Sequence, residues 1–595
     1  MKNNVKGINN KAISNLITNF LLIKNLPTHY KFVRENKKGK LLGKKVKFSP
    51  YLNLIDLMEN NPEIKNKVAI KQDREVTYLE FQKEIDKLGQ FLHYEIGALK
   101  GENITICAES SIEGIESFFA FNKLGLVNAR AFNGAKKDKL NHSIIDFDSR
   151  IVFTDDSNLD ELSISLDGTR VENIIIMSET TEEKINNFKQ KNPNVNIYLW
   201  SEIISKEYPY DDYIEEVGIN DMASILYTSG SSGEPKPISI TNKVYVNMPN
   251  IVETTANQKI CDDEKVIGVV SHEYPYAAIN STVMILLMGK TLILPKTSEN
   301  NTLDFHDLIK NHPDKIQAIP NFYKLLESAI SKGEVDTNDL KHLKSIVSGG
   351  ETYLLEEKID IINFLNKFLT DPLLIDGFGF GELGSATALK FGLSDYFLLM
   401  NGIVAKAIDE KTGEDLKTGK EGILCISSPS ISKCYYNNEE ATKDSYITDK
   451  NGNYWFKSDT YGSVHGMFNR LVKLGGRIRE YFITGDGHGN FVKVYAGNVE
   501  NSIMATNIVE NCIVVPSDSS ALPTAVAYIS IKDDCFLTPD EIENKVKESC
   551  KTLEEFAQPT EIIIEKEIKR TDAQKKDYKY YRQLQLAKDK IKTLC

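Results

Sequence analysis

Apolar and polar positions alternate along the chain with two different periods. Between residues 78 and 92, apolar side chains recur every three or four positions, which predicts a helix with one buried face. The members of this face are Tyr78, Phe81, Ile85, Leu88 and Leu92. Thr77 and Glu80 stand just before and within this stretch at the spacing of a capping box. Short apolar runs that predict buried strands lie at 68–70, 104–107, 151–154, 173–177 and 196–200. The alternation of both patterns predicts an α/β architecture with parallel sheets.

The pattern changes after about residue 476. Residues 511–516 and 524–531 are typical of paired strands, and residues 561–564 of another strand. A helix is expected to begin at Thr538, because Glu541 follows at capping-box spacing and Pro539 suits the first helical position. A segment of about 115 residues has the size of an independent domain. We therefore expect a domain over residues 48–476 and an α+β domain over residues 477–595.

Residues 1–47 are rich in Lys and Asn and are interpreted as an N-terminal extension. Their longest apolar run near the middle, residues 20–23, is far shorter than the roughly 20 residues that a membrane span needs. The segment also lacks the apolar block and small-residue cleavage site of a signal peptide. We expect no transmembrane segment, and a surface helix followed by a polar linker. A helix that lies on a membrane surface or docks a partner is the alternative.

Composition narrows the function classes. The 595 residues are 41% hydrophobic and 26% charged, which is typical of a globular protein with several structural units. The formal net charge is −12. We interpret the acidic and basic residues as mixed along the chain. This charge distribution argues against a nucleic-acid or anionic-membrane partner. The eight cysteines form no C-x-x-C pair, which predicts reduced thiols and a cytoplasmic location.

The candidate chemistry begins in a loop that follows the apolar run 222–226. Its candidate phosphate-binding residues are Thr228, Ser229, Gly230, Ser231, Ser232, Gly233 and Lys236. Glycine lets backbone N–H groups turn toward an anion, hydroxyls add donors, and lysine adds positive charge. A Walker loop is disfavoured, because Glu234 and Pro235 precede the lysine and Pro237 replaces the magnesium-binding Ser or Thr.

Residues 228–236 match the pattern Ser/Thr-Ser-Gly-Ser/Thr-Ser/Thr-Gly-x-Pro-Lys position by position. In this loop the chain resembles the adenylate-forming superfamily of acyl-CoA synthetases, adenylation domains and luciferases, and the resemblance extends from about Tyr51 to the C-terminus. It implies a large N-terminal domain of α/β sheets with a β-barrel-like subdomain, and a small mobile α+β C-terminal domain. It also implies ATP and Mg²⁺ as cofactors, with Thr228 among the catalytic residues.

A second glycine-rich string, residues 379–384, satisfies the G-x-G-x-x-G pattern of dinucleotide-binding folds. It lies deep in the chain rather than at the head of a domain. Phe378, Gly379 and Glu382 instead resemble the superfamily's Tyr-Gly-x-Thr-Glu motif. The resemblance implies that Phe378 flanks adenine, that Gly379 lies in the nucleotide site, and that Glu382 is catalytic and binds Mg²⁺. Gly381 departs from the motif and lacks the hydroxyl that would reach the α-phosphate.

Other motifs follow in the superfamily's order. Residues 348–351 resemble its Gly-Gly-Glu turn, which lines both the acyl and adenine pockets. The resemblance implies substrate-pocket roles for Ser348 and Gly349, and nucleotide-binding roles for Gly350 and Glu351.

Residues 454–459 resemble the motif Trp-x-x-Thr-Gly-Asp, with Lys457 and Ser458 in place of Thr-Gly. The resemblance implies that Asp459 accepts hydrogen bonds from both ribose hydroxyls, and a carboxylate has the two acceptor oxygens for this. It further implies that Arg477 contacts ribose or phosphate. The resemblance also implies that Arg479 or Glu480 takes the pivot position of the interdomain hinge.

Residues 569–578 resemble the C-terminal motif Pro-x-Thr-x-x-Gly-Lys, which implies that Lys575 is the catalytic lysine. The motif's Pro and Gly are replaced by Lys569 and Gln574, and Lys576 is adjacent. Attack of a carboxylate on the α-phosphate brings two anions together, so a lysine between them acts most strongly in the transition state. By the superfamily's behaviour, the C-terminal domain then rotates and presents a second face for thiol attack.

Residues 271–281 lie where acyl-CoA synthetases have a Pro-x-x-His-x-x-Gly element, which implies substrate-pocket roles for His272 and Tyr276. Amino-acid-activating relatives bind the α-ammonium group with an aspartate in this region. No Asp occurs between Glu264 and Leu303, which favours a substrate without an α-amino group.

These features predict a two-domain ligase that activates a carboxylic acid with ATP and passes the acyl group to a thiol, with CoA as the expected acceptor. The phosphopantetheine of an acyl carrier protein and an amine are the alternative acceptors. A non-catalytic relative that binds nucleotide or acyl ligand as a sensor or scaffold is the alternative of another class. The departures at positions 381, 457, 458 and 574 motivate this last alternative.

Overall fold

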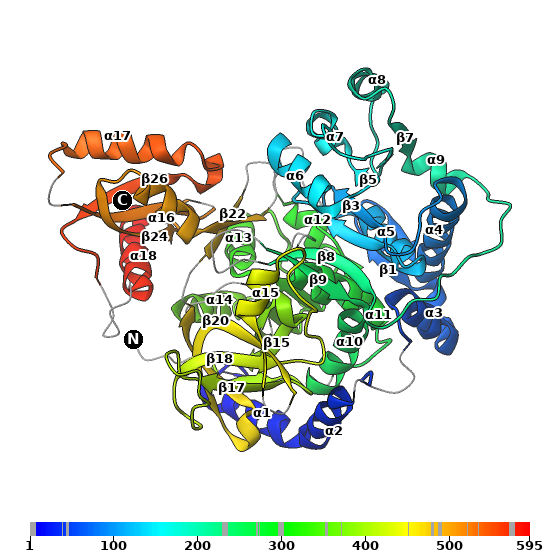
Figure 1. Ribbon diagram of the computed structural model, residues 1–595. Coiled ribbons are helices and arrows are strands. Elements are labelled where there is room, and N and C mark those ends of the chain that lie inside the picture. The colour runs from blue at the N-terminus through cyan, green and yellow to red at the C-terminus, as the bar shows by residue number, and fades with distance from the viewer. Residues whose placement is uncertain are drawn as a thin grey trace.

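Figure 1 shows the computed structural model of the chain. It describes residues 7–38, 40–42, 47–228, 236–256, 258–268, 272, 274–295, 303–350, 355–369, 372–449, 452–477, 481–485, 491–520, 522–532, 535–569 and 577–594. A large body is built from residues up to 477, and a smaller unit from residue 481 onward lies at the left of Figure 1.

The first sheet of the large body has the strand order β7-β6-β5-β3-β4-β8-β9. Its strands are β3 (Asn103–Cys107), β4 (Val127–Arg130), β5 (Ile151–Thr154), β6 (Asn173–Ile176), β7 (Asn196–Leu199), β8 (Met222–Thr228) and β9 (Lys236–Thr241). All neighbours in this sheet are parallel except β8 and β9, which pair antiparallel. The apolar runs at 104–107, 151–154, 173–177 and 196–200 therefore form parallel strands, as predicted.

The second sheet has a parallel part and an antiparallel part. The parallel part contains β1 (Val68–Lys71), β10 (Lys265–Gly268), β11 (Thr291–Ile293), β12 (Lys315–Ala318), β13 (Ser345–Gly349) and β14 (Leu373–Phe380), with β2 (Glu75–Thr77) antiparallel at its edge. The antiparallel part contains β15 (Ser385–Phe391), β16 (Phe397–Leu399), β17 (Val404–Ile408), β18 (Gly422–Ser427), β19 (Tyr446–Thr448), β20 (Tyr454–His465) and β21 (Leu471–Arg477). It corresponds to the expected β-barrel-like subdomain, and it joins the parallel part through the β14–β15 pair.

Helices pack around these sheets. Those of the large body are α3 (Pro50–Asn60), α4 (Tyr78–Gln90), α5 (Ile112–Lys123), α6 (Lys137–Phe147), α7 (Asp156–Ser163), α8 (Glu182–Lys191), α9 (Trp200–Ser205), α10 (Asn242–Ala256), α11 (Met284–Leu287), α12 (Phe305–Ile309), α13 (Pro320–Ser331), α14 (Leu355–Leu365) and α15 (Glu439–Ser445). The predicted capping box between Thr77 and Glu80 begins α4, and all five predicted apolar positions are buried, four in α4 and Leu92 in the π-helical turn η2 (Phe91–Glu95) that follows it. One buried cluster includes Ile106 of β3, Leu226 of β8 and Val266 of β10, so the two sheets share a core.

The smaller unit has its own core. Its hairpin β22 (Tyr481–Gly485) and β23 (Phe491–Tyr495) precedes a sheet of β24 (Val509–Ser517), β25 (Thr524–Ile531) and β26 (Pro559–Glu565), with helices α16 (Ala496–Met504), α17 (Pro539–Cys550) and α18 (Tyr578–Leu594). The predicted pairing of the strands around 511–516 and 524–531 and the Thr538–Glu541 capping box are both present. Ion pairs connect the unit to the large body, with Lys139 Nζ 2.8 Å from a Glu554 oxygen and Lys324 Nζ 3.0 Å from an Asp518 oxygen.

The N-terminal extension contains the helices α1 (Lys11–Lys24) and α2 (Leu26–Lys37). The Asn9 side chain donates to the carbonyl of Pro372 at 2.8 Å and accepts from the backbone N–H of Leu374 at 2.9 Å. Farther along, the backbone N–H of Gly402 donates to His29 Nδ1 at 3.2 Å. The extension is therefore attached to the second sheet at the start of β14 and again just after β16.

Candidate active site

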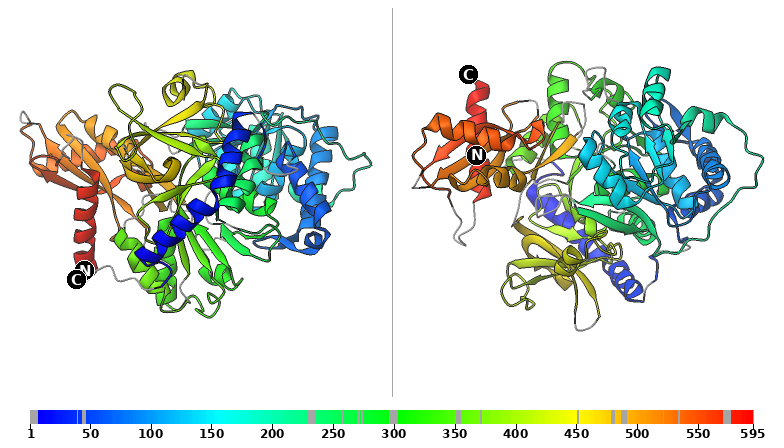
Figure 2. Two further views of the ribbon diagram at one scale, coloured as in Figure 1. Left: turned by 90° about the horizontal axis from the view of Figure 1, so that it is seen from below. Right: turned by 45° about the horizontal axis from the view of Figure 1, so that its top comes forward.

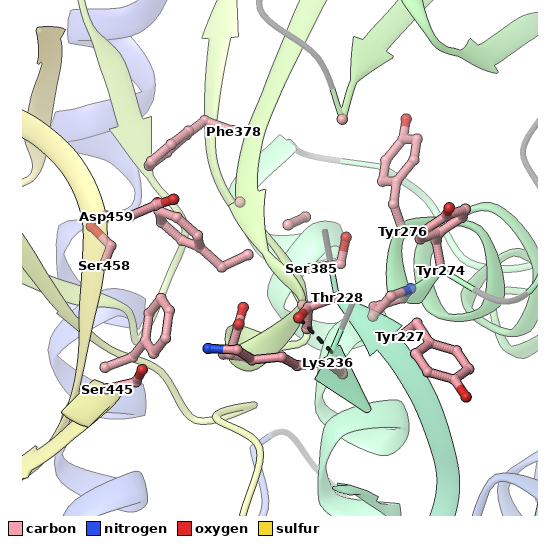
Figure 3. Close-up of a pocket in the computed structure, with 18 of the residues that line it drawn as sticks. Tyr227, Thr228, Lys236, Tyr274, Tyr276, Phe378, Ser385, Ser445, Ser458 and Asp459 are labelled. Carbon is pink, nitrogen blue, oxygen red and sulfur yellow. Dashed lines mark hydrogen bonds between the residues drawn. The ribbon is translucent and has the colours of Figure 1, made fainter. Parts of the chain in front are cut away.

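A cavity of about 450 Å³ opens between the two sheets of the large body (Figure 3). Its lining residues are Tyr227, Thr228, Lys236, Tyr274, Pro275, Tyr276, Gly350, Gly377, Phe378, Gly379, Phe380, Gly381, Glu382, Ser385, Ala386, Ile423, Tyr435, Asp444, Ser445, Phe456, Lys457, Ser458 and Asp459. Motifs that lie far apart in the sequence therefore meet at one site. Among the residues that the structure describes after 481, none lines this cavity.

The ends of the predicted phosphate loop are held together as a hairpin. Thr228 ends β8 and Lys236 begins β9, and the two residues face each other in the antiparallel register. The Thr228 hydroxyl donates to the backbone carbonyl of Lys236 at 3.2 Å. A Walker loop leads into a helix, whereas this loop leads into a strand, so the structure supports the rejection of a P-loop. Ser229, Gly230, Ser231, Ser232 and Gly233 lie outside the described residues.

The second glycine-rich string also leads into a strand. After β14, a single 3₁₀ turn (Gly381–Leu383) leads directly into β15, which runs antiparallel to β14. A dinucleotide fingerprint requires a helix at this point, so the dinucleotide interpretation is excluded. Phe378, Gly379 and Glu382 all line the cavity.

The glycine at position 381 follows from local packing. A Cβ atom on Gly381 would lie 2.9 Å from Thr228 Cγ2 and 3.0 Å from Pro275 Cγ. Real Cβ atoms do not approach other atoms this closely, so a side chain at 381 would have to displace Thr228 or Pro275. The superfamily's motif has a side chain at this position. In this chain Thr228 and Pro275 occupy the space that such a side chain would need.

Glu382 is buried and held by a tyrosine that the sequence analysis did not identify. The Tyr435 hydroxyl donates to Glu382 Oε1 at 2.6 Å, and the backbone N–H of Ser432 donates to the Glu382 carbonyl at 2.7 Å. Burial and the neighbouring Glu382 charge raise the pKa of Tyr435, so this hydroxyl remains a donor. Lys236 Nζ lies 5.4 Å from the centre of the Tyr435 ring. An oriented carboxylate and a lysine thus lie beside the same tyrosine.

The donor set around Glu382 fits a magnesium ion only together with a bound phosphate. Within the described ranges there is no group of three or more His, Cys, Asp or Glu residues that could hold a metal by itself. Mg²⁺ is commonly bound by one or two carboxylates together with substrate phosphates and waters. Glu382 is a suitable carboxylate for this arrangement, because it lines the same cavity as Thr228 and Lys236.

Asp459 lies on the opposite wall of the cavity from Tyr274 and Tyr276. Figure 3 shows Phe378, Ser458 and Asp459 on one side of the cavity, Tyr274 and Tyr276 on the other, and Thr228 and Lys236 between them. The Ser458 hydroxyl donates to the carbonyl of Leu424 at 2.8 Å, which fixes the strand next to Asp459. The backbone of Arg477 pairs with Thr460, so it lies close to Asp459 in the sheet. The Arg477 side chain lies outside what the structure describes.

The predicted substrate-side residues are divided by the structure. Tyr276 begins a π-helical turn, η3 (Tyr276–Val283), and lines the cavity together with Gly350. Gly349 lies behind Tyr276, because a Cβ atom there would lie 3.5 Å from Tyr276 Cζ. Ser348 is buried, and its hydroxyl has no hydrogen-bond partner among the described residues. Neither Gly349 nor Ser348 lines the cavity itself.

His272 does not line the cavity either. It is buried, and its Nε2 atom lies 2.9 Å from the Thr282 hydroxyl oxygen. Burial and the positive charge of Arg130 lower the pKa of His272 to about 3, so the ring is neutral. Its surroundings are those of a structural histidine. Glu351, Arg479, Glu480 and Lys575 lie outside the described residues.

One cavity of an α/β fold is lined by the ends of the β8–β9 hairpin, an aromatic ring and two carboxylates. These groups are typical of a nucleotide-binding enzyme. The chain belongs to the AMP-binding enzyme family, whose model matches residues 58–436. It is 25% identical over 537 residues to acetyl-coenzyme A synthetase 1 of Candida albicans, and the match covers 84% of this chain and 75% of that protein. It is 25% identical over 420 residues to luciferin 4-monooxygenase of Photuris pensylvanica, which covers 68% of this chain and 72% of that protein.

Solved structures confirm the predicted fold. Apo MatB from Rhodopseudomonas palustris matches with a TM-score of 0.60 at 16% identity, covering 90% of this chain and 98% of that one. A long-chain-fatty-acid-CoA ligase (FadD1) from Archaeoglobus fulgidus matches with a TM-score of 0.62 at 15% identity, covering 87% and 97%. Within the described ranges, no helix has the length and apolar character that crossing a membrane requires.

Proposed function

We propose that the protein activates a carboxylic acid with ATP as an acyl-adenylate and transfers the acyl group to the thiol of CoA. The observation that carries this proposal is the order of groups across the cavity. A ribose-type carboxylate, Asp459, lies on one side, and Tyr276 lies on the other. Thr228 and Lys236, which end the phosphate loop, lie between them. A nucleotide bound along this line presents its α-phosphate toward the tyrosine side, where a carboxylic acid would bind.

Each described residue then has a role in the first half-reaction. Asp459 accepts hydrogen bonds from the ribose hydroxyls, and Phe378 and Gly379 flank the adenine. Lys236 and the Thr228 hydroxyl bind phosphate oxygens. Glu382, oriented by Tyr435, is the carboxylate for Mg²⁺, which when bound supplies positive charge at the phosphates.

The residues outside the described ranges complete the proposal. Lys575 would lie between the carboxylate and the α-phosphate, where positive charge lowers the barrier for the approach of two anions. The C-terminal domain, residues 477–595, would then turn at Arg479 or Glu480 and open the adenylate to a thiol. The separate buried cluster of the unit after residue 481 supports a moving domain, and Ile483 packs in a cluster of the large body near the expected hinge.

The names of the relatives favour CoA as the acceptor. Acetyl-coenzyme A synthetase 1 of Candida albicans and a probable 4-coumarate–CoA ligase of Dictyostelium discoideum, which is 30% identical over 252 residues, are both named for CoA thioester formation. The latter match covers 41% of this chain and 43% of that protein. We place the reaction in the cytoplasm, where ATP and CoA are available.

Acceptor competition tests this proposal. The protein is incubated with ATP, Mg²⁺ and an accepted acid, and AMP release is measured with CoA, with a phosphopantetheine-loaded carrier protein, or with an amine. We expect CoA to increase AMP release and to yield an acyl-CoA. If AMP release increased only with the carrier protein or only with the amine, that compound and not CoA would be the acceptor.

A further inference from the structure

Charge is strongly segregated between the N-terminal extension and the rest of the chain. Residues 1–47 contain 12 Lys and Arg residues and one acidic residue, Glu35, which gives the extension a formal charge of +11. The whole chain has a net charge of −12, so the other 548 residues carry −23. The expectation that acidic and basic residues are mixed along the chain is therefore wrong for this segment. A segment with this charge is attracted to an anionic membrane surface.

Helix α1 directs its polar side toward the protein. Ser14 and Thr18 are almost completely buried. The backbone N–H of Leu393 donates to the Ser14 hydroxyl at 3.1 Å, and the Thr18 hydroxyl donates to the Ser394 hydroxyl at 3.1 Å. These contacts fix the rotation of the helix about its axis. Leu21 and Leu22 are also buried, so the inward side of α1 combines two hydroxyls with apolar side chains and does not take up all the apolar residues of the helix.

The outward side of α1 is apolar as a result. Ile13 is 41% exposed, Leu16 68%, Phe20 63% and Ile23 67%. The spacing of three, four and three residues places these four side chains, which we call the α1 stripe, on one face of the helix. Tyr30 continues the same spacing in α2 and is 43% exposed. Single exposed apolar residues are ordinary, but a stripe of four marks an interaction surface.

Exposed basic residues accompany the α1 stripe. Lys24, Lys31, Arg34, Lys37 and Lys38 are exposed. Lys24 Nζ lies 5.9 Å from the centre of the Phe20 ring, and Lys11 is paired with Asp395 at 2.6 Å. Figure 1 places α1 and α2 along the lower edge of the molecule, and the left view of Figure 2 shows both helices lying flat across that face. Both helices are therefore accessible from outside along their whole length.

We propose that this face binds an anionic lipid membrane surface, with the α1 stripe in the interface and the basic residues of the extension at the lipid headgroups. A helix that combines an apolar face with Lys and Arg residues lies in the plane of such an interface. Clusters of Lys and Arg are attracted to the anionic leaflet over about a Debye length. The acidic remainder of the chain is repelled by the same surface, so the charge segregation fixes the orientation of the bound protein.

Vesicle co-sedimentation of the full chain tests the proposal. The vesicles contain phosphatidylcholine alone or with about 30% phosphatidylserine, a composition that creates an anionic surface. We expect binding to the phosphatidylserine vesicles, and weaker binding when NaCl is raised from about 0.1 M to about 0.5 M. The triple variant Leu16→Gln/Phe20→Gln/Ile23→Gln should reduce the apparent affinity at least about tenfold. The charge variant Lys31→Glu/Arg34→Glu/Lys37→Glu should do the same and tests the surface independently if the first variant folds poorly.

The matched control is Leu99→Gln/Ile164→Gln/Phe536→Gln, which removes apolar side chains that are 68%, 42% and 94% exposed elsewhere on the molecule. Vesicle binding by this control should equal that of the unmodified protein. Absence of binding to phosphatidylserine vesicles would overturn the proposal. Equal binding by the α1 stripe variant and the control variant would overturn it as well. A dimer in size-exclusion chromatography that becomes a monomer on substitution of the α1 stripe would instead assign the face to a second copy of the chain.

Discussion

At the scale of single residues, the site depends on how Glu382 is held. A buried carboxylate is stable only when it has partners, and the Tyr435 hydroxyl at 2.6 Å supplies one. The phenol remains protonated because burial and Glu382 raise its pKa. One carboxylate oxygen is thereby fixed, which orients the group toward the cavity that Lys236 and Asp459 also line.

Replacement of Glu382 should therefore affect catalysis more than replacement of its partner. We expect Glu382→Gln to lower kcat for acid-dependent pyrophosphate formation by about 100-fold or more, because the variant loses the charge of the proposed magnesium ligand. Tyr435→Phe keeps the carboxylate and removes one donor, so we expect a loss of about tenfold. Steady-state kinetics at saturating ATP measures both values. Equal losses in both variants would contradict the assignment of Glu382 as the primary ligand.

Gly381 should be required for stability. The single Cβ atom in Gly381→Ala would lie 2.9 Å from the Thr228 methyl group, so we expect the free energy of unfolding to fall by about 1–3 kcal/mol. Gly497→Ala is the matched control, because a Cβ atom at Gly497 meets nothing within 4 Å. Gly497 also lies in α16, and Ala is favourable in a helix. Chemical denaturation measures both changes. A variant at 381 as stable as the control would show that Thr228 and Pro275 can move at no cost.

At the scale of elements, a strand and a helical turn form the two walls of the cavity. β20 presents Asp459, whereas the π-helical turn η3 presents Tyr276 on the other side. The ring of Tyr276 lies against Gly349, and it is buried enough that its pKa is raised. If the acid binds on the side of Tyr276, as proposed, we expect the wall at η3 to limit its size.

Shortening Tyr276 should change acid selectivity. We expect Tyr276→Ala to raise kcat/KM for longer acids relative to short ones by about tenfold, since each added methylene in an apolar pocket contributes a factor of this order. Tyr276→Phe keeps the ring and should leave the ratio unchanged. Competition between acids of increasing chain length measures the ratio. An unchanged ratio in Tyr276→Ala would place the acyl group elsewhere.

Local signals predicted the elements well, and contacts between distant segments were harder to predict. The helix at 78–90, its capping box and the strands at 104–107 and 151–154 follow from residues close together in the chain. The Tyr435–Glu382 contact joins positions 53 residues apart, and no spacing rule relates them. The burial of Ser14 in α1 was also beyond local patterning, because it depends on a hydrogen bond to Leu393.

At the scale of the whole molecule, catalysis and domain position are linked. The described residues of the C-terminal unit contribute nothing to the lining of the cavity, although ion pairs at Glu554 and Asp518 connect that unit to the large body. The proposed reaction requires Lys575 at the cavity in the first half-reaction. The account therefore requires the C-terminal domain to take at least two positions.

Lys575→Ala separates the two half-reactions. We expect the variant to lose about 100-fold or more in adenylate formation, because no cation then stabilises the approach of the two anions. Thioester formation from supplied acyl-AMP should change less than about threefold, since the proposed rotation removes Lys575 from the site before that step. Single-turnover assays of each half-reaction give both values, and Lys576→Ala is the matched neighbour. Equal loss in both steps would contradict rotation of the domain.

The most direct test of the central claim is acid-dependent exchange of labelled pyrophosphate into ATP. The account predicts that at least one carboxylic acid in a broad panel supports exchange, that exchange requires Mg²⁺, and that it proceeds without CoA. An enzyme that forms an acyl-adenylate must show this reversal. ATP binding with no exchange for any acid would contradict the account and identify the chain as a non-catalytic nucleotide-binding relative.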